Sequence, residues 1–196
     1  MPAQTLLALL TFAVVTSMTP GPNTLTMTAS GVNFGFMRTV PHIMGVQIGF
    51  MIVLVACAGG LGVVFTTYPS LQWVLKVAGA LYLCWLAWKV ATSGGPGRKE
   101  AAKPLTFLQA AAFQWVNPKG LVVALSTFAI YVRPDHALND SIIVLIIFTV
   151  TTALSSVSWT GFGSAMRELL RDPRRARIFN ITMALLLVAS IVPMVI

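Results

Sequence analysis

Two proline-containing segments hold the residues best suited to bind a ligand. Pro20-Gly21-Pro22-Asn23 and Asn117-Pro118-Lys119 each interrupt a long apolar stretch. Proline removes a backbone donor and clashes with the preceding turn, so each segment should break a helix and free polar backbone groups. Asn23 and Asn117 are suited to cap the helix that follows, which would point backbone N–H groups and the positive end of a helix dipole into a cavity. With the charge of Lys119, this predicts a site for a carboxylate or another anion.

Further polar residues within the apolar stretches are candidates for the same cavity. They are Gln47, Gln114, Thr149, Thr152 and Ser156. The two threonines and the serine, with Thr160, share one face of a predicted helix, which should avoid lipid. Two simpler alternatives remain: the polar stripe forms only interhelical hydrogen bonds, and the prolines merely kink two helices while Lys119 reaches the headgroups.

The elements that must position these residues are membrane helices. Hydrophobic residues make up 57% of the chain and charged residues 9%, which indicates an all-α integral membrane protein. The apolar windows predict six transmembrane helices, of which the proline segments break the first and the fourth. Their expected ranges are 5–27, 43–65, 71–90, 105–132, 142–162 and 178–196.

The basic residues predict how these helices are oriented. Ten of the 13 Lys and Arg residues lie at the end of, or after, the first, third and fifth expected helices: Arg38, Lys89, Arg98, Lys99, Lys103, Arg167, Arg171, Arg174, Arg175 and Arg177. The positive-inside rule places these connections in the cytoplasm and both termini on the opposite, periplasmic side. The net charge of +8 therefore reflects topology rather than binding of nucleic acid.

The two broken helices also suggest an internal repeat. Each opens a set of three helices, and an odd number of crossings inverts the second set relative to the first. The expected architecture is a single transmembrane domain over 1–196, with inverted halves 1–91 and 105–196 joined by a cytoplasmic linker 92–104.

Enzymatic chemistry has little support in the sequence. The chain has five carboxylates, expected outside the helix cores, and two histidines far apart. Cys57 and Cys84 are isolated, so neither a metal site nor a disulfide is expected. No cofactor is implied.

A family resemblance rests on three segments. Residues 18–23 (MTPGPN), 114–119 (QWVNPK) and 79–89, which contain GALYL and WLAWK, are similar to the LysE superfamily of amino-acid exporters, in its homoserine and threonine efflux branch. Residues 85–93, 124–128 and 184–188 most resemble bacterial cysteine and O-acetylserine exporters.

This resemblance implies an inner-membrane exporter with six helices that is driven by the proton gradient and self-associates. The two breaks themselves suggest alternating access as its mechanism. Many relatives carry aspartate at the position of Asn23, so the proton carrier stays open, with His42 and Asp135 as candidates. The substrate alternatives are homoserine, threonine or a lactone derived from them. Alternatives outside the carrier class are a channel and a membrane assembly partner.

Overall fold

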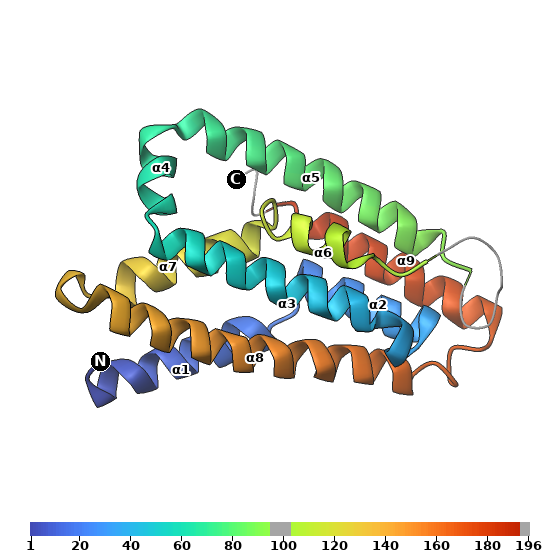
Figure 1. Ribbon diagram of the computed structural model, residues 1–196. Coiled ribbons are helices and arrows are strands. Elements are labelled where there is room, and N and C mark those ends of the chain that lie inside the picture. Colours follow the sequence, from blue (N-terminus) through green and yellow to red (C-terminus); the bar gives the residue numbers. More distant parts are fainter. Residues whose placement is uncertain (95–102, 193–196) are drawn as a thin grey trace.

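The regular secondary structure of the described part of the chain is all helical. The computed structural model describes residues 1–94 and 103–192 (Figure 1). The helices are α1 (Ala3–Met18), α2 (Pro22–Phe34), α3 (Phe36–Ala58), α4 (Leu61–Thr67), α5 (Pro69–Ala91), α6 (Phe107–Phe113), α7 (Pro118–Tyr131), α8 (Ala137–Ala165) and α9 (Pro173–Ala189), with a short 3-10 helix η1 (Pro134–His136) before α8.

Both expected breaks are present. The axes of α1 and α2 differ by 48° across the break at residues 19–21. Residues 114–117 separate α6 from α7, and both α2 and α7 begin with proline. Proline suits the first helical position because its missing N–H would have no intrahelical partner there.

Membrane-crossing length is reached by fewer helices than expected. Three segments within the described residues are long and apolar enough to cross alone: Phe36–Ala58, Pro69–Ala91 and Pro134–Ala165. The bent pair α1–α2 can be counted as a fourth. In the described residues α7 and α9 are shorter, with 14 and 17 residues. The all-helical membrane architecture is thus supported, and six crossings remain a prediction.

Several expected boundaries were wrong. The second helix runs from Phe36 to Ala58 instead of 43–65, because the chain turns at Gly60, whose φ of 97° is left-handed and favours glycine. The segment after this turn forms the separate helix α4. The fifth helix begins at Ala137, so Asp140 lies inside it rather than before it.

The sixth helix also begins earlier than expected. The Asp172 side chain accepts hydrogen bonds from the N–H groups of Arg174 (2.9 Å) and Arg175 (3.0 Å), which caps α9 at Pro173. These arginines therefore lie in the first turn of α9 and not in the preceding connection. Expectations for residues 95–102 and 193–196 lie outside the described residues.

Glycines allow the helices of the two expected halves to pack closely. The main packing partners are α2 with α8, α3 with α6, and α5 with α9. A Cβ on Gly31 would overlap the carbonyl of Thr160, and one on Gly163 the carbonyl of Thr28, so α2 and α8 touch through their backbones. A Cβ on Gly49 would come within 2.6 Å of the Ala111 Cα, which places α3 equally close to α6.

The two ends of the bundle differ in charge. In Figure 1 the α2–α3 turn, the end of α5 and the α8–α9 connection lie at one end, and the start of α1 and the α7–α8 turn lie at the other. Arg38, Lys89 and Arg167 are at the first of these ends, which we call the basic end. Most other basic residues of the described chain lie there too: Lys103, Arg171, Arg174, Arg175 and Arg177.

Polar residues gather inside the bundle while large apolar residues cover it. All of α2 from Pro22 to Asn33 is buried except Asn23, although this helix carries four threonines or serines. Thr26 and Thr28 bond the carbonyls one turn earlier, and the Ser30 hydroxyl bonds that of Thr39 in α3. Leu81, Trp88 and Ile146 are among many exposed apolar side chains. This inversion suits a lipid environment.

Candidate functional site

A cavity lies where the two breaks meet. Helices α1, α2, α3, α7 and α8 all contribute to its wall. Its lining residues are Thr16, Ser17, Gly21, Pro22, Asn23, Thr24, Met27, Val46, Phe50, Asn117, Lys119, Gly120, Val123, Phe148, Thr152, Ser155 and Ser156. Segments about 100 residues apart in the sequence thus form one polar site.

Lys119 crosses from the second break to the first. Its Nζ atom donates a hydrogen bond of 2.6 Å to the carbonyl oxygen of Thr19, one of the groups that the first break frees. The side chain lies against Gly21, where a Cβ would come within 2.8 Å of the lysine Cδ. No carboxylate of the described residues pairs with Lys119. The half-buried ammonium therefore brings an uncompensated positive charge to the cavity wall.

Three side-chain amides join the breaks on the other side. Asn23 Nδ2 donates to Gln114 Oε1 (2.8 Å), and Gln114 Nε2 donates back to Asn23 Oδ1 (3.2 Å). Asn117 Nδ2 also approaches Gln114 Oε1 at 3.4 Å. The Oδ1 atom of Asn117 is buried and has no partner among the described residues. Asn117 also lines the cavity, and an amide oxygen can accept two hydrogen bonds.

The expected asparagine caps did not form. Gly21 occupies the N-cap position of α2, so Asn23 is the second helical residue and was wrongly expected to be the cap. Asn117 does occupy the N-cap position of α7, but its side chain makes no cap hydrogen bond because the amide turns toward Gln114. Both helices therefore start without a side-chain cap.

These uncapped starts leave backbone donors at the cavity. The first turns of α2 and α7 contain Asn23, Thr24, Lys119 and Gly120, and the N–H groups of these residues have no acceptor among the described residues. All four residues line the cavity. The positive ends of two helix dipoles thus meet the same space, next to the Lys119 ammonium. Such an arrangement favours an anionic group.

The other sequence candidates lie around this centre at different depths. Thr152 and Ser156 line the cavity, whereas Gln114 is fully buried and belongs to the amide network instead. Gln47 bonds Thr152 Oγ1 (3.0 Å) and the Thr149 carbonyl (3.1 Å), so it supports α8 rather than lining the wall. The remaining candidates Pro20, Pro118 and Thr149 are not on the wall, and Thr149 and Pro20 are exposed.

Sequence reasoning missed several wall residues. Ser155 donates a 2.6 Å hydrogen bond to the carbonyl of Ser17, just before the first break, and both line the cavity. Thr16 and Thr24 do so as well. Thr24 Oγ1 accepts a hydrogen bond of 2.8 Å from the Gly21 N–H. Proximity to the break in sequence was the available signal for Thr16, Ser17 and Thr24.

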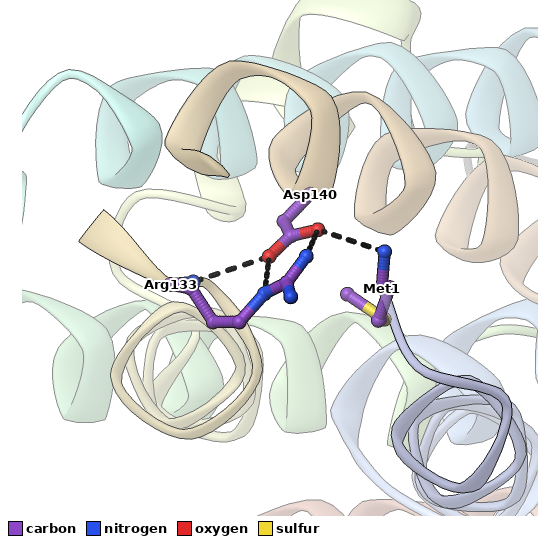
Figure 2. Close-up of polar contacts among 3 residues, drawn as sticks. All are labelled: Met1, Arg133 and Asp140. Carbon is purple, nitrogen blue, oxygen red and sulfur yellow. Dashed lines mark hydrogen bonds and ion pairs between the residues drawn. The ribbon is translucent and has the colours of Figure 1, made fainter. Parts of the chain in front are cut away.

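An ion cluster joins three segments at the end opposite the basic end. Figure 2 shows Asp140 of α8 between the Arg133 guanidinium and the amino nitrogen of Met1. Arg133 Nε and the Asp140 carboxylate are 2.8 Å apart, and the Met1 nitrogen lies 3.5 Å from the same carboxylate. Hydrogen bonding to Asp140 raises the pKa of Arg133 above its ordinary value. The cluster fixes α1 to the start of α8 at this end.

The two proposed proton carriers lie away from the cavity. His42 is buried in α3 and lines a different cavity, and Asp135 is exposed in η1. Among the described residues, no cluster of His, Cys, Asp and Glu side chains is placed to hold a metal ion. Cys57 and Cys84 are both free thiols.

The fold and the site together define a class. Membrane-length apolar helices that surround a polar cavity between two broken helices form the arrangement of a transporter. A family model described as LysE type translocator matches residues 14–192, and the chain belongs to this family. It is accordingly a transport protein and not an enzyme.

Several curated relatives are similar over nearly the whole chain. A cysteine/O-acetylserine efflux protein of Escherichia coli (strain K12) is 34% identical over 179 residues, which cover 91% of each chain. The proteins of the same name from Shigella sonnei (strain Ss046) and Escherichia coli O139:H28 are 34% and 33% identical over equal coverage. No solved structure matches the chain.

Proposed function

We propose that this protein exports a small amino acid or a close derivative from the cytoplasm across a bacterial inner membrane. Cysteine and O-acetylserine are the favoured substrates because the similar relatives are named for their efflux. The cavity between the breaks is the proposed binding site, and its main support is the pair of uncapped helix starts that face it together with Lys119.

The carboxylate of the substrate is expected to bind at the helix starts. It would accept hydrogen bonds from the free N–H groups of α2 and α7 and pair with Lys119, whose charge has no partner among the described residues. Hydrogen bonds to charged groups are about twice as strong as neutral ones. Lys119 would give up its hydrogen bond to the Thr19 carbonyl and pair with the substrate carboxylate instead. Substrate binding would thereby be coupled to the contact between the two breaks.

The rest of the cavity suits the other parts of a zwitterionic amino acid. The unpartnered Oδ1 of Asn117 can accept a hydrogen bond from the substrate ammonium. Met27, Val46, Phe50 and Phe148 supply an apolar wall for a short side chain. No acidic residue of the described chain lines the cavity, so a substrate with a second cationic group would find no carboxylate partner among these residues. This favours small neutral amino acids.

Alternating access between two inverted halves is the proposed transport mechanism. In this proposal halves 1–91 and 105–196 form a single six-helix domain, and the basic end faces the cytoplasm with both termini periplasmic. The packing of α2 on α8 and of α3 on α6 supports it, because each pair joins opposite halves. The ion cluster around Asp140 would then hold the periplasmic end closed in this conformation. Movement of one half against the other would open it.

The driving force is proposed to be the proton gradient. Asn23 at the first break cannot carry a proton, so coupling would need another group, and His42 and Asp135 remain the candidates. Self-association also remains a prediction, for which the exposed apolar faces of the helices provide surface.

Uptake into everted membrane vesicles tests this function. Labelled O-acetylserine would be offered with and without an imposed proton gradient, and competed with unlabelled cysteine, threonine, homoserine and leucine. Saturable, gradient-dependent uptake blocked mainly by cysteine is the expected result. Transport of threonine or homoserine without O-acetylserine would overturn the substrate, and unsaturable flux would indicate a channel.

A further inference from the structure

A second cavity lies at the basic end of the bundle. Its wall comes from the later part of α2, the start of α3, the end of α5 and the segment that leads into α6. The residues used below are Asn33, His42, Lys89, Ser93 and Lys103. Neither the proposed binding site nor the ion cluster at the opposite end includes any of them.

The wall of this second cavity is positively charged. Lys89 and Lys103 both line it, and the lining residues include no aspartate or glutamate. Neither lysine pairs with a carboxylate of the described residues. Lys89 is half-buried, with its Nζ atom 5.2 Å from the centre of the Trp85 ring. Among the described residues, an anionic group entering the cavity would therefore meet two cations and no acid.

A buried histidine supplies an independent indication of a ligand. His42 is only 1% exposed, and its Nδ1 atom has no hydrogen-bond partner among the described residues. Most buried polar atoms in folded proteins are paired, so an unpaired one in a cavity wall needs an explanation. A bound polar molecule would supply the missing partner.

The second cavity lies along α2 from the first. Asn23, Thr24 and Met27 line the first cavity, and Asn33 lies near the other end of the same helix. On α3, Val46 lines the first cavity and His42, one turn earlier, the second. Met27 and Val46 are both buried and belong to the same apolar cluster. They line the first cavity where α2 and α3 lead toward the second.

We propose that the second cavity is an entry site, where the exported amino acid binds before it passes Met27 and Val46. This rests on the proposed function. Its carboxylate pairs with Lys89 and Lys103, and His42 gains a hydrogen-bond partner. Its ammonium faces the final turn of α2, where the negative end of the helix dipole lies. On its way out, the substrate thus binds near the C-terminal end of α2 in the second cavity, and then near the uncapped N-terminal end of α2 in the first cavity.

A kinetic comparison tests the role of Lys89. Lys89→Gln should raise the KM for O-acetylserine by roughly ten-fold in everted vesicles, as expected for loss of a charged hydrogen bond, while Vmax stays nearly unchanged. Lys76→Gln is the matched control, since Lys76 is an exposed lysine of the same helix that lines neither cavity. If Lys89→Gln leaves the KM for O-acetylserine unchanged in everted vesicles, and also in right-side-out vesicles, the entry site is overturned.

A labelling experiment separates this proposal from the function of the first cavity. Ser93→Cys, in a background with Cys57 and Cys84 replaced by alanine, places a single thiol in the second cavity. O-acetylserine, which has no thiol, should slow its modification by a maleimide, and this protection should persist when Lys119→Gln is added. Protection that disappears with Lys119→Gln would assign the effect to the first cavity, and the absence of protection would reject the entry site even where transport is normal.

Discussion

Replacement of Lys119 by glutamine is the sharpest test of the proposed binding site. The glutamine side chain keeps an N–H donor that can reach toward the Thr19 carbonyl, but it removes the charge. The contact between the two breaks should therefore survive better than in an alanine variant. What the substitution removes is the ion pair with the substrate carboxylate.

The expected loss follows from the strength of that interaction. A hydrogen bond to a charged group contributes about 1.5–3 kcal/mol, which corresponds to a roughly 10- to 150-fold weaker binding of substrate. The remaining N–H donors at the starts of α2 and α7 should preserve some affinity. Lys119→Ala, which removes both the charge and the bond to Thr19, should abolish export.

Initial uptake rates in everted vesicles, at substrate concentrations well below KM, measure this loss. Cysteamine, which is cysteine without its carboxylate, serves as a competitor that cannot use the anion site. The wild-type protein should prefer cysteine strongly, and Lys119→Gln should largely lose that preference. A Lys119→Gln protein that is present at normal amounts and keeps both the rate and the preference would remove Lys119 from the site.

Three further substitutions test the packing, the ion cluster and the ammonium site. Gly163→Ala should lower the thermal midpoint in detergent by several degrees, because the new Cβ overlaps the α2 backbone, while Gly161→Ala, with open space around it, should not. Asp140→Asn should lower the free energy of unfolding by about 1–2 kcal/mol. This is less than the loss of a fully buried ion pair would cost, because the Arg133 guanidinium is 40% exposed. The control Asp135→Asn should leave the free energy of unfolding unchanged. Asn117→Leu should raise the KM for amino acids but leave the affinity for carboxylates that lack an ammonium group unchanged, and an equal loss for both would assign Asn117 a structural role.

The sequence was sufficient to predict which segments meet, but not how they meet. Proline at two equivalent places marked both breaks, since no other residue so directly removes a backbone donor. Neither the bond from Lys119 to Thr19 nor the amide pair of Asn23 and Gln114 follows from local patterns. Those contacts depend on the path of each chain segment after its break, which long-range packing decides.

The errors at the helix ends have local causes. Asparagine is a good N-cap, and this general preference suggested Asn23 for that role. Proline prefers the first helical position, and with Pro22 there the cap position moves back to Gly21. At the second break Asn117 holds the cap position, but Gln114 competes for its side chain. Side-chain competition of this kind cannot be seen in a hydropathy window.

The missing caps give a physical reason why a small solute should hold the two breaks together. A side-chain cap stabilises a helix start by about 1 kcal/mol, and here two neighbouring starts lack one. Their free N–H groups, aimed into low-dielectric surroundings, are satisfied only by water or by a ligand. A carboxylate that bridges both starts replaces two missing caps at once, and it does so only while the breaks are in contact. We therefore expect bound substrate to stabilise the closed arrangement of the two halves, so that O-acetylserine raises the thermal midpoint of the wild-type protein more than that of Lys119→Gln.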